Sequence, residues 1–409
     1  MKNTEDIPEI YEIGQLPPPG IVPKYMYAQV LRQNRYGEPI NAFSIEKVEI
    51  PAIADDEVLV AVKAAGLNYN SVWAARGYPL DMIRLMKLRR ETNVDFHIIG
   101  SDCSGIVYKK GALVKNVEIG DEVVIQPAWY DPEDPWIKNG GDTTISKTSR
   151  AWGYETNWGS FAQFCKVRYF QCLPKPIHLY WDQAAVYMLS GPTVYRMLFH
   201  YAPNIVTEGD VVLIWGGAGG LGSMAIQLVK LAGGIPVAVV NSEEKKKFCE
   251  EMGALAINRS EFSHWGGLTS EMLKPENQLD WGLQAKKFMK KITHLTGGKL
   301  PNIVLEHPGE NTWPTSVYVC NRDGMIVTCA GTTGYFCSFD VRYLWLQRKR
   351  IQGSHYANLQ ECIALNQLVM DKKVYPVLTE TYSFEELPIA LQKMHENKHK
   401  GNIAIQIGY

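Results

Sequence analysis

At 409 residues the chain is long enough for two domains, and 46% hydrophobic with 21% charged residues is ordinary for a globular protein. The formal net charge of -1 argues against nucleic acid as a partner. No run of about eighteen apolar residues predicts a membrane span, and the N-terminal MKNTEDIPEIYEIG lacks the apolar core of a signal peptide. We therefore expect a cytoplasmic protein.

The eight cysteines are dispersed along the chain, and no two of them form a C-x-x-C pair. This pattern is typical of free, mostly buried thiols in a reducing compartment and not of a disulfide framework. It also offers no clustered four-cysteine zinc site and no Cys/His set with the spacing of a catalytic zinc site. We therefore expect no metal. The cysteines are Cys103, Cys165, Cys172, Cys249, Cys320, Cys329, Cys337 and Cys362.

The first part of the chain reads as β structure. Residues 1–24, with PPPG at 17–20, predict an extended arm laid over the surface or over a partner subunit. From residue 26 to about 175, short alternating or apolar runs are separated by Gly, Pro, Asn and Asp, which predicts a compact β-barrel-like domain. Two interruptions have helical character, 70–76 and 80–90, and the second carries four basic residues.

Beyond Trp181 the pattern changes to alternating helices and strands. An amphipathic helix is predicted over 181–200 and a strand, turn and helix over 208–227. This alternation favours a doubly wound parallel sheet, which we assign to 177–371. The tail, 372–409, has the strand, helix, strand pattern of a segment that returns to the first domain. Further strands are predicted at 235–240, 303–306 and 325–330, and further helices at 243–251, at 284–295 and from about Leu359.

The most informative stretch is VVLIWGGAGGLGSMAIQ at 211–227. A buried strand is followed by glycines with G-x-G-x-x-G spacing and then by an apolar helix. Such glycines permit a tight turn, a close approach of the backbone to a pyrophosphate and close packing of the helix, whose N-terminus faces the phosphates. The alternative is a glycine-rich turn of another α/β fold. The predicted cofactor-binding residues of this turn are Gly217, Ala218, Gly219, Gly220, Leu221 and Gly222.

The tip of the second strand of this unit indicates which dinucleotide is bound. It reads Asn241-Ser242, without the acidic residue that binds a ribose 2′-hydroxyl in NAD enzymes, and 245–247 are lysines. This favours a 2′-phosphate and hence NADPH, with Ser242 and Lys245 as candidate ligands. Glu243 and Glu244 argue the other way. The lysines also fit the solvated face of a helix.

Several motifs resemble the crotonyl-CoA carboxylase/reductases, a zinc-free group of the medium-chain dehydrogenase/reductase superfamily. The resemblance covers nearly the whole chain and implies a GroES-like β-barrel catalytic domain, 1–176 with 372–409, and a Rossmann NADPH-binding domain. It also implies a homodimer or homotetramer. The motifs are NYNSVW (68–73), HIIGSDCSGIV (97–107), GDEVV (120–124), WGYETNWGSFAQF (152–164), LPKPIHLYWDQAA (173–185), LIWGGAGGLGS (213–223), EHPG (306–309), RYLW (342–345), KRIQGSHYAN (349–358) and NKHKG (397–401).

The reaction that the resemblance implies is reductive carboxylation of an enoyl-CoA. Hydride delivery to the β-carbon leaves an enolate at the α-carbon, which then attacks carbon dioxide. Such a site needs a few fixed donors in a dry pocket. The resemblance assigns the carbon dioxide site to Asn70, Tyr154, Glu155 and His355. Asn70 and His355 would donate N–H groups to carbon dioxide, and Glu155 would orient the histidine or a water.

These four residues also have plainer interpretations. Asn70 fits a helix N-cap, Glu155 a surface turn and His355 a satisfied core histidine. Tyr154 departs from the family, which usually has Phe. If its hydroxyl reaches the α-carbon, protonation competes with carboxylation; if it points elsewhere, the ring seals the pocket as Phe does.

Other positions are candidates for binding the CoA and the nicotinamide. In RYLW, Arg342 suits a phosphate and Tyr343 an adenine ring, although a solvated Arg beside a core Tyr fits equally. Thr193 matches a superfamily position near the nicotinamide and pyrophosphate, or else serves helix packing. Cys329 follows a predicted strand, where backbone groups meet the nicotinamide. The apolar stretch 325–339 is a candidate sheet edge for pairing between copies.

Three functions remain open at this point. The first is a carboxylating enoyl-CoA reductase with NADPH, and the second a plain NADPH-dependent enoyl-CoA reductase, acting on acryloyl- or crotonyl-CoA with Tyr154 or water as proton source. The third is a non-catalytic, quinone-reductase-like nucleotide-binding protein. The intact motifs make this last one the least favoured.

Overall fold

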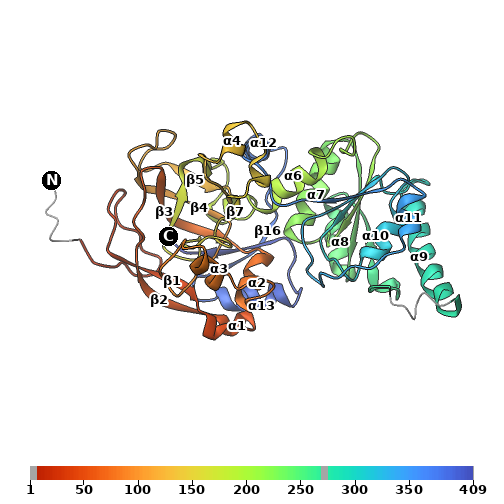
Figure 1. Cartoon of the computed structure of the whole chain (residues 1–409), viewed down its shortest axis with the longest axis horizontal. Coiled ribbons are helices and arrows are strands. Elements are labelled where there is room, and N and C mark those ends of the chain that lie inside the picture. Colours follow the sequence, from red (N-terminus) through yellow and green to blue (C-terminus); the bar gives the residue numbers. More distant parts are fainter. Residues whose placement is uncertain (1–6, 269–274, 409) are drawn as a thin grey trace. The chain divides into compact units, whose positions relative to one another are not determined.

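The structure is a computed structural model that describes residues 7–268 and 275–408. The chain divides into two compact units, Met1–Pro192 with Ala357–Tyr409, and Thr193–Tyr356. Figure 1 shows that the last part of the chain, in blue, returns to the unit formed by the first part. The predicted Rossmann domain, 177–371, is wider at both ends than this second unit. Helix α12, for example, groups with the first unit.

The first unit is built around a seven-stranded sheet of order β16-β17-β3-β4-β5-β9, in which β8 also pairs with β3. Strand β3 (EVLVAVKAAG) is buried along almost its whole length, because it is covered on both faces and bonded on both sides. The strands are β1 (Tyr25–Leu31), β2 (Phe43–Glu49), β3 (Glu57–Gly66), β4 (Cys103–Lys110), β5 (Glu122–Ile125), β6 (Ala128–Trp129), β7 (Arg150–Ala151), β8 (Phe164–Arg168), β9 (Cys172–Pro174), β16 (Leu378–Ser383) and β17 (Asn402–Gln406).

Short helices and the N-terminal arm complete this unit. Residues 7–24 of the predicted arm lie along it, where Tyr108 donates to the carbonyl of Pro17 and Gln163 donates to the carbonyls of Tyr11 and Glu12. Residues 1–6 of the arm lie outside the described part of the chain. The helices are α1 (Pro39–Ala42), α2 (Tyr69–Arg76), α3 (Met82–Leu88), α4 (Pro135–Lys138), α5 (Trp181–Ala184), α12 (Leu359–Met370) and α13 (Leu387–His395).

The single helix predicted over 181–200 is wrong. Two helices, α5 and α6 (Ser190–Phe199), are separated by a turn. The backbone N–H groups of Met188 and Leu189 donate to the buried carboxylate of Asp102, at 3.0 and 3.3 Å. Because these donors are directed to a side chain of another element, they do not continue the helical ladder. A long-range contact thus overrides the local periodicity.

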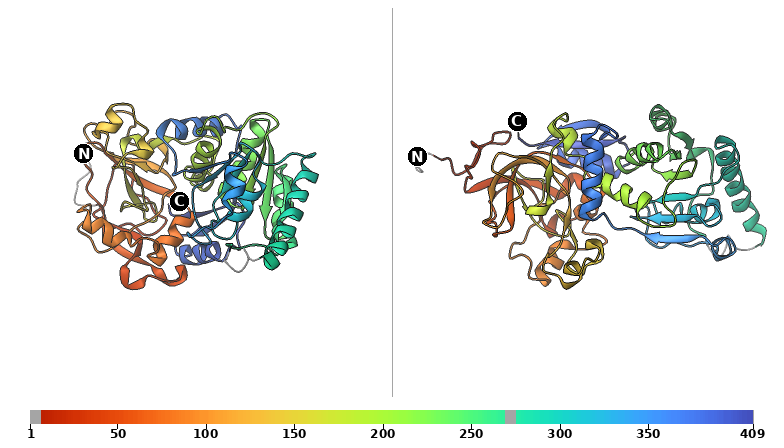
Figure 2. Two further views of the ribbon diagram at one scale, coloured as in Figure 1. Left: turned by 45° about the vertical axis from the view of Figure 1, so that its right-hand side comes forward. Right: turned by 90° about the horizontal axis from the view of Figure 1, so that it is seen from above.

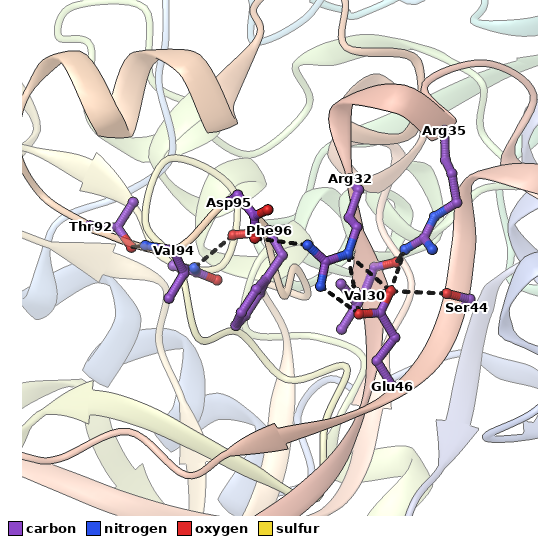
Figure 3. A network of polar contacts seen from close by, with 10 residues as sticks. Val30, Arg32, Arg35, Ser44, Glu46, Thr92, Val94, Asp95 and Phe96 are labelled. Atoms are coloured by element: carbon purple, nitrogen blue, oxygen red, sulfur yellow. Dashed lines mark hydrogen bonds and ion pairs between the residues drawn. The ribbon is translucent and has the colours of Figure 1, made fainter.

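A charged network fastens the β1–β2 hairpin to the loop before His97 (Figure 3). Arg32 bonds Glu46 at 2.6 Å and Asp95 at 2.8 Å, and Arg35 adds a second bond to Glu46 at 2.8 Å. The hydrogen bond from Arg32, followed in size by one from Arg35, lowers the pKa of Glu46 to about 2 despite partial burial. Asp95 is mostly exposed, so its ion pair contributes little.

We expect Glu46→Gln to lower the free energy of unfolding at pH 7 by about 1 to 2 kcal/mol, after allowance for screening by solvent. The folded pKa of Glu46 lies below its ordinary value of 4.5. Its stabilisation is therefore complete above about pH 5 and is lost as the pH falls toward 2. Urea unfolding of both proteins between pH 7 and 3 measures this. A difference that stays constant across that range would contradict the assignment.

The second unit is a doubly wound parallel sheet of order β12-β11-β10-β13-β14-β15, with helices on both of its faces (Figures 1 and 2). In its hydrophobic core, alternate residues of the strands pack against side chains of α9 and α10. The strands are β10 (Val211–Trp215), β11 (Ile235–Val240), β12 (Leu255–Asn258), β13 (Ile303–Glu306), β14 (Met325–Thr328) and β15 (Arg350–Gly353). The remaining helices are α7 (Gly220–Leu231), α8 (Glu243–Glu251), α9 (Pro275–Leu295), α10 (Trp313–Val319) and α11 (Val341–Trp345).

The structure differs from two predictions for this unit, the start of one helix and the position of the sheet edge. The helix predicted at 284–295 begins earlier, as α9. The predicted sheet edge at 325–339 is not an edge, because β14 is paired with β13 on one side and with β15 on the other. On this side of the sheet the edge strand is β15, which pairs with β14 alone among the described strands. Within residues 7–268 and 275–408, no helix is both long and apolar enough to cross a membrane.

Candidate active site

Asn70 lies in the first turn of α2, directly after the end of β3. The N-cap position of the helix is Asn68, whose side chain makes no capping hydrogen bond, so the interpretation of Asn70 as the N-cap is wrong. The side-chain amide of Asn70 is half-buried and donates to Ser101 Oγ at 2.9 Å. Two residues earlier, the amide of Asn68 donates to Asp102 at 3.2 Å. The two asparagines therefore fasten the start of α2 to neighbouring residues of one buried segment.

Asp102 is a functional candidate that the sequence reasoning missed. Burial raises the pKa of its carboxyl to about 7, and bonds from Asn68 and from the N–H groups of Leu189 and Met188 oppose that rise. A single acid inside the apolar run HIIGSDCSGIV was the available signal, since an acid in such a run needs partners. By holding Asn68 and the turn before α6, Asp102 fixes the frame on which Asn70 sits.

The loop that carries Tyr154 and Glu155 is attached to the same segment as Asn70. The N–H of Gly100 donates to the carbonyl of Gly153 at 3.0 Å. Gly153 has a φ of +69°, and a Cβ there would lie 2.0 Å from the carbonyl oxygen of Gly100, so only glycine fits. Since Asn70 bonds Ser101 and Tyr154 follows Gly153, the structure brings the two predicted residues onto one backbone frame.

Glu155 closes a turn against β7. Its N–H donates to the carbonyl of Ala151 at 2.7 Å, and its Oε2 accepts from the N–H of Ala151 at 2.9 Å. The side chain is half-buried, so it is a turn residue as the plainer interpretation held, but not a fully solvated one. The ring of Tyr154 packs against the apolar core of the first unit, as a phenylalanine would.

His355 belongs to the second unit, two residues beyond the end of β15. Its side chain is exposed, so the interpretation as a core histidine is wrong. The residue before it is anchored: the N–H of Ser354 donates to Thr328 at 2.8 Å, and its hydroxyl accepts from Tyr201 at 3.0 Å. The backbone is thus fixed while the imidazole remains accessible. Asn70, Tyr154 and Glu155 lie in the other unit.

The glycines of the predicted cofactor turn have different tasks. A Cβ on Gly217 would lie 2.5 Å from the Cβ of Ala238, and one on Gly222 would lie 2.4 Å from the carbonyl oxygen of Gly216. These two glycines are required by packing alone. A Cβ on Gly219, the N-cap of α7, would meet nothing closer than 3.5 Å. The space beside Gly219 therefore suits a pyrophosphate at the helix N-terminus.

Gly216 completes this turn and was missed by the sequence reasoning. Its φ is +60°, and a Cβ would lie 2.6 Å from Nε2 of His307. Ala218 is buried, whereas Gly220 and Leu221 are partly accessible in the first turn of α7. Thr193 is buried in α6, in agreement with either of its interpretations.

The tip of β11 fits a 2′-phosphate. Ser242 caps α8 and accepts from the N–H of Lys245 at 3.2 Å. Glu243, which argued for NAD, is held by Asn258 at 2.7 Å and by Lys246 at 3.6 Å, so its carboxylate already has two partners. Lys247 pairs with Glu251. Lys245 and Lys246 are half-buried and Lys247 is exposed, but Lys246 is directed to Glu243, and Lys245 is the one whose backbone N–H contacts the cap.

Cys329 directly follows β14, as predicted. Its N–H donates to the carbonyl of Glu306 at 3.3 Å, and burial raises the pKa of its thiol to about 12. The thiol is therefore neutral, and the backbone groups at this position remain the candidates for contact with a cofactor amide.

The two residues predicted to bind CoA, Arg342 and Tyr343, differ in exposure. Arg342 is exposed and bonds Asp340 at 2.6 Å. Tyr343 packs edge-on against Tyr318, with ring centroids 5.0 Å apart, and against the core of the unit. Lys349, which follows α11, is buried, and its ammonium donates to the carbonyls of Val317 and Tyr318 at 2.6 and 3.2 Å.

No group of three or more His, Cys, Asp or Glu side chains is arranged to hold a metal ion within the part of the chain that the structure describes. A GroES-like unit joined to a doubly wound sheet with this phosphate turn defines a medium-chain dehydrogenase/reductase. The family model of the alcohol dehydrogenase GroES-like domain matches residues 54–177, and that of zinc-binding dehydrogenases matches 220–371. The second name describes the family, and the described residues do not supply its zinc ligands.

Comparison with individual proteins narrows the class. The crotonyl-CoA carboxylase/reductase of Cereibacter sphaeroides is 47% identical over 98% of this chain and 91% of its own length. The structure of the carboxylase/reductase AntE in complex with NADP aligns with a TM-score of 0.93 at 46% identity, over 98% of this chain and 99% of AntE. The structure of the 2-octenoyl-CoA carboxylase reductase CinF in complex with NADP and 2-octenoyl-CoA aligns with a TM-score of 0.86 at 38% identity. The alignment covers 95% of this chain and 88% of CinF. The chain belongs to the crotonyl-CoA carboxylase/reductase family, which confirms the resemblance.

Proposed function

We propose that this protein catalyses the NADPH-dependent reductive carboxylation of an enoyl-CoA, of the crotonyl-CoA to ethylmalonyl-CoA type. The observation that carries this proposal is the 47% identity to a carboxylase/reductase along nearly the entire chain. When bound, NADPH supplies the hydride that adds to the β-carbon. The remaining task of the protein is to hold carbon dioxide at the α-carbon and to exclude other electrophiles.

The geometry of the first unit supports roles for three residues. One N–H of the Asn70 amide is directed to Ser101, which fixes the amide plane and leaves the second N–H to donate to an oxygen of carbon dioxide. Glu155 uses Oε2 to hold its turn, which leaves Oε1 to orient a water or a histidine. The ring of Tyr154 packs against the core of the first unit, which suits a residue that shields the site from water. We assign His355 as the second donor because its imidazole is exposed on a fixed backbone.

A plain enoyl-CoA reductase is the second candidate, favoured by the phenol of Tyr154. A protonated phenol is able to donate to an enolate, which carbon dioxide would otherwise capture. A relative from Streptomyces collinus, 39% identical over 91% of this chain and 83% of its own length, is named crotonyl-CoA reductase.

The test is to incubate the protein with crotonyl-CoA, NADPH, carbon-13 bicarbonate and carbonic anhydrase, and to identify the product by mass spectrometry. Labelled ethylmalonyl-CoA is the expected product. Unlabelled butyryl-CoA alone would establish the reductase instead, and Tyr154→Phe would then restore carboxylation if the phenol is the proton donor. Oxidation of NADPH with neither product would remove both candidates.

We propose NADPH as the cofactor because Ser242 and Lys245 lie at the N-terminus of α8, where the carboxylate of Glu243 is already bonded to Asn258 and Lys246. Lys245→Gln is expected to raise KM for NADPH about tenfold and to leave KM for NADH unchanged, since only NADPH carries the 2′-phosphate. Lys247→Gln, which alters an exposed lysine paired with Glu251 on the same helix, is the matched control. Equal effects of the two variants would show a general loss of positive potential instead of a specific contact.

We further propose that Arg342 and Tyr343 bind the CoA phosphates and adenine. Arg342 supports this role because its guanidinium is exposed and is already oriented by Asp340.

We also propose a cytoplasmic homodimer or homotetramer. The open edge of β15, where Ile351 is 39% exposed, supports self-association, since an edge strand left open is a site for pairing. Light scattering of the purified protein distinguishes dimer from tetramer.

A further inference from the structure

Glu306 is a buried carboxylate that the roles above do not use. It is the last residue of β13 and is fully inaccessible. Its Oε1 accepts from the N–H of Gly309 at 3.1 Å and from the hydroxyl of Thr312 at 2.7 Å, and its Oε2 accepts from the hydroxyl of Ser316. Both carboxylate oxygens thus accept hydrogen bonds, and these fixed donors stabilise a negative charge in the interior.

The position of Glu306 in the sheet is the second observation. In the order β12-β11-β10-β13-β14-β15, the chain moves outward from β10 on one side and from β13 on the other. In doubly wound sheets the ligand lies over the carboxyl ends of the two strands where the direction reverses. These strand ends are Trp215 and Glu306, and Nε2 of His307 bridges them by donating to the carbonyl of Trp215 at 2.9 Å.

The same network reaches the glycine turn. Trp215 donates from its indole to Ser316 Oγ at 2.8 Å, and Ser316 in turn donates to Glu306. Gly216, which opens the turn, must be glycine because His307 occupies the place of its Cβ. The charge of Glu306 is therefore rigidly fixed relative to the turn that we assign to the pyrophosphate.

We propose that Glu306 stabilises the oxidised cofactor relative to the reduced one, and thereby favours hydride donation. The inference rests on the proposed use of NADPH. The nicotinamide ring is neutral in NADPH and positively charged in NADP⁺, so a fixed carboxylate at this strand end attracts only the oxidised form. A charge about 10 Å away at an effective dielectric constant of about 20 corresponds to roughly a tenfold difference in relative affinity.

The ionisation of Glu306 makes this preference depend on pH. Burial raises its pKa to about 7, against the bonds from Ser316, Gly309 and Thr312. The titratable and charged groups that face it are Arg259, His307, Cys329 and Cys337. Burial lowers the pKa of His307 and raises the pKa of both thiols, so these three are neutral, and Arg259 keeps its charge in both states of the cofactor. Glu306 is the group that titrates near neutrality.

The experiment is to measure Kd for NADP⁺ and for NADPH by calorimetry between pH 6 and 8.5, without acyl-CoA. The ratio of Kd for NADPH to Kd for NADP⁺ cancels effects common to both, such as ionisation of the 2′-phosphate. In the unmodified protein we expect this ratio to rise about tenfold as the pH passes 7. In Glu306→Gln, which keeps the shape of the side chain, we expect the low-pH ratio throughout.

Ser316→Ala is the companion variant, since it removes one donor but keeps the carboxylate. It raises the pKa of Glu306 further and should move the rise in the ratio to higher pH. If Glu306→Gln weakens both nucleotides by the same factor, Glu306 is only a structural support and the proposal is wrong. If that variant does not fold, a ratio independent of pH in the unmodified protein overturns the proposal equally. Because no acyl-CoA is present, failure of carboxylation leaves these ratios unchanged.

Discussion

Asn70→Leu is expected to convert the protein from a carboxylase into a reductase. Leucine removes the N–H that we assign to carbon dioxide and also the bond to Ser101, but it retains a similar volume at a half-buried position of α2. Loss of one oriented donor at a developing charge typically costs a factor of 100 to 1000, roughly 3 to 4 kcal/mol. We therefore expect carboxylation to fall at least about a hundredfold while NADPH oxidation continues and butyryl-CoA accumulates.

The control for this prediction is Ser101→Ala, which removes the partner of Asn70 but leaves its amide in place. We expect an intermediate loss of carboxylation, because the amide keeps both N–H groups but is no longer fixed in orientation. Product ratios with carbon-13 bicarbonate measure both variants, and thermal unfolding shows whether α2 remains attached. If Asn70→Leu carboxylates as well as the unmodified protein does, Asn70 does not bind carbon dioxide.

Gly219→Ala should abolish tight NADPH binding without unfolding the protein. A Cβ at this position meets no protein atom closer than 3.5 Å, so it projects into the space that we assign to the pyrophosphate. We expect Kd for NADPH to rise at least about thirtyfold, roughly 2 kcal/mol, with the melting temperature unchanged within about 2 °C.

Gly222→Ala is the matched comparison, because its Cβ would lie 2.4 Å from the carbonyl oxygen of Gly216 and 2.5 Å from the Cα of Gly217. Backbone atoms do not move aside as a flexible side chain does, so this variant should lose stability as well as binding. Calorimetric binding and thermal unfolding of the two variants separate these effects. If Gly219→Ala destabilises the fold as much as Gly222→Ala does, the space beside Gly219 is not reserved for a ligand.

The sequence predicted the two architectures, the phosphate turn and the returning tail, because each depends on local periodicity or on glycine spacing. The same periodicity failed for 181–200, where the carboxylate of Asp102 takes two backbone donors from a distant part of the chain. It failed again for 325–339, since strand order decides which strand is the edge, and the short β15 carries little apolar pattern.

The site residues were predictable to different degrees. The resemblance supplied Asn70, Tyr154, Glu155 and His355, but pattern alone assigned Asn70 to a cap and His355 to a core. Those errors arise because a cap depends on the exact start of a helix, and exposure depends on which elements cover a loop. Glu306 stood in the quoted motif EHPG, yet its burial follows from the hydroxyls of α10, whose approach no local signal reveals.

The placement of β17 has a consequence for synthesis of the protein. Strand β3 is central to the first unit, yet one of its partners, β17, is translated only after the whole of Thr193–Tyr356. The nucleotide-binding unit, whose strands are all contiguous in sequence, therefore leaves the ribosome before β17 does. At that stage the backbone groups of β3 at Ala64–Gly66 have no β17 to pair with. Domains generally fold as units during synthesis, the N-terminal one first. For this chain we expect that order to be reversed, because the sheet of the inserted unit can be completed before β17 is available to β3.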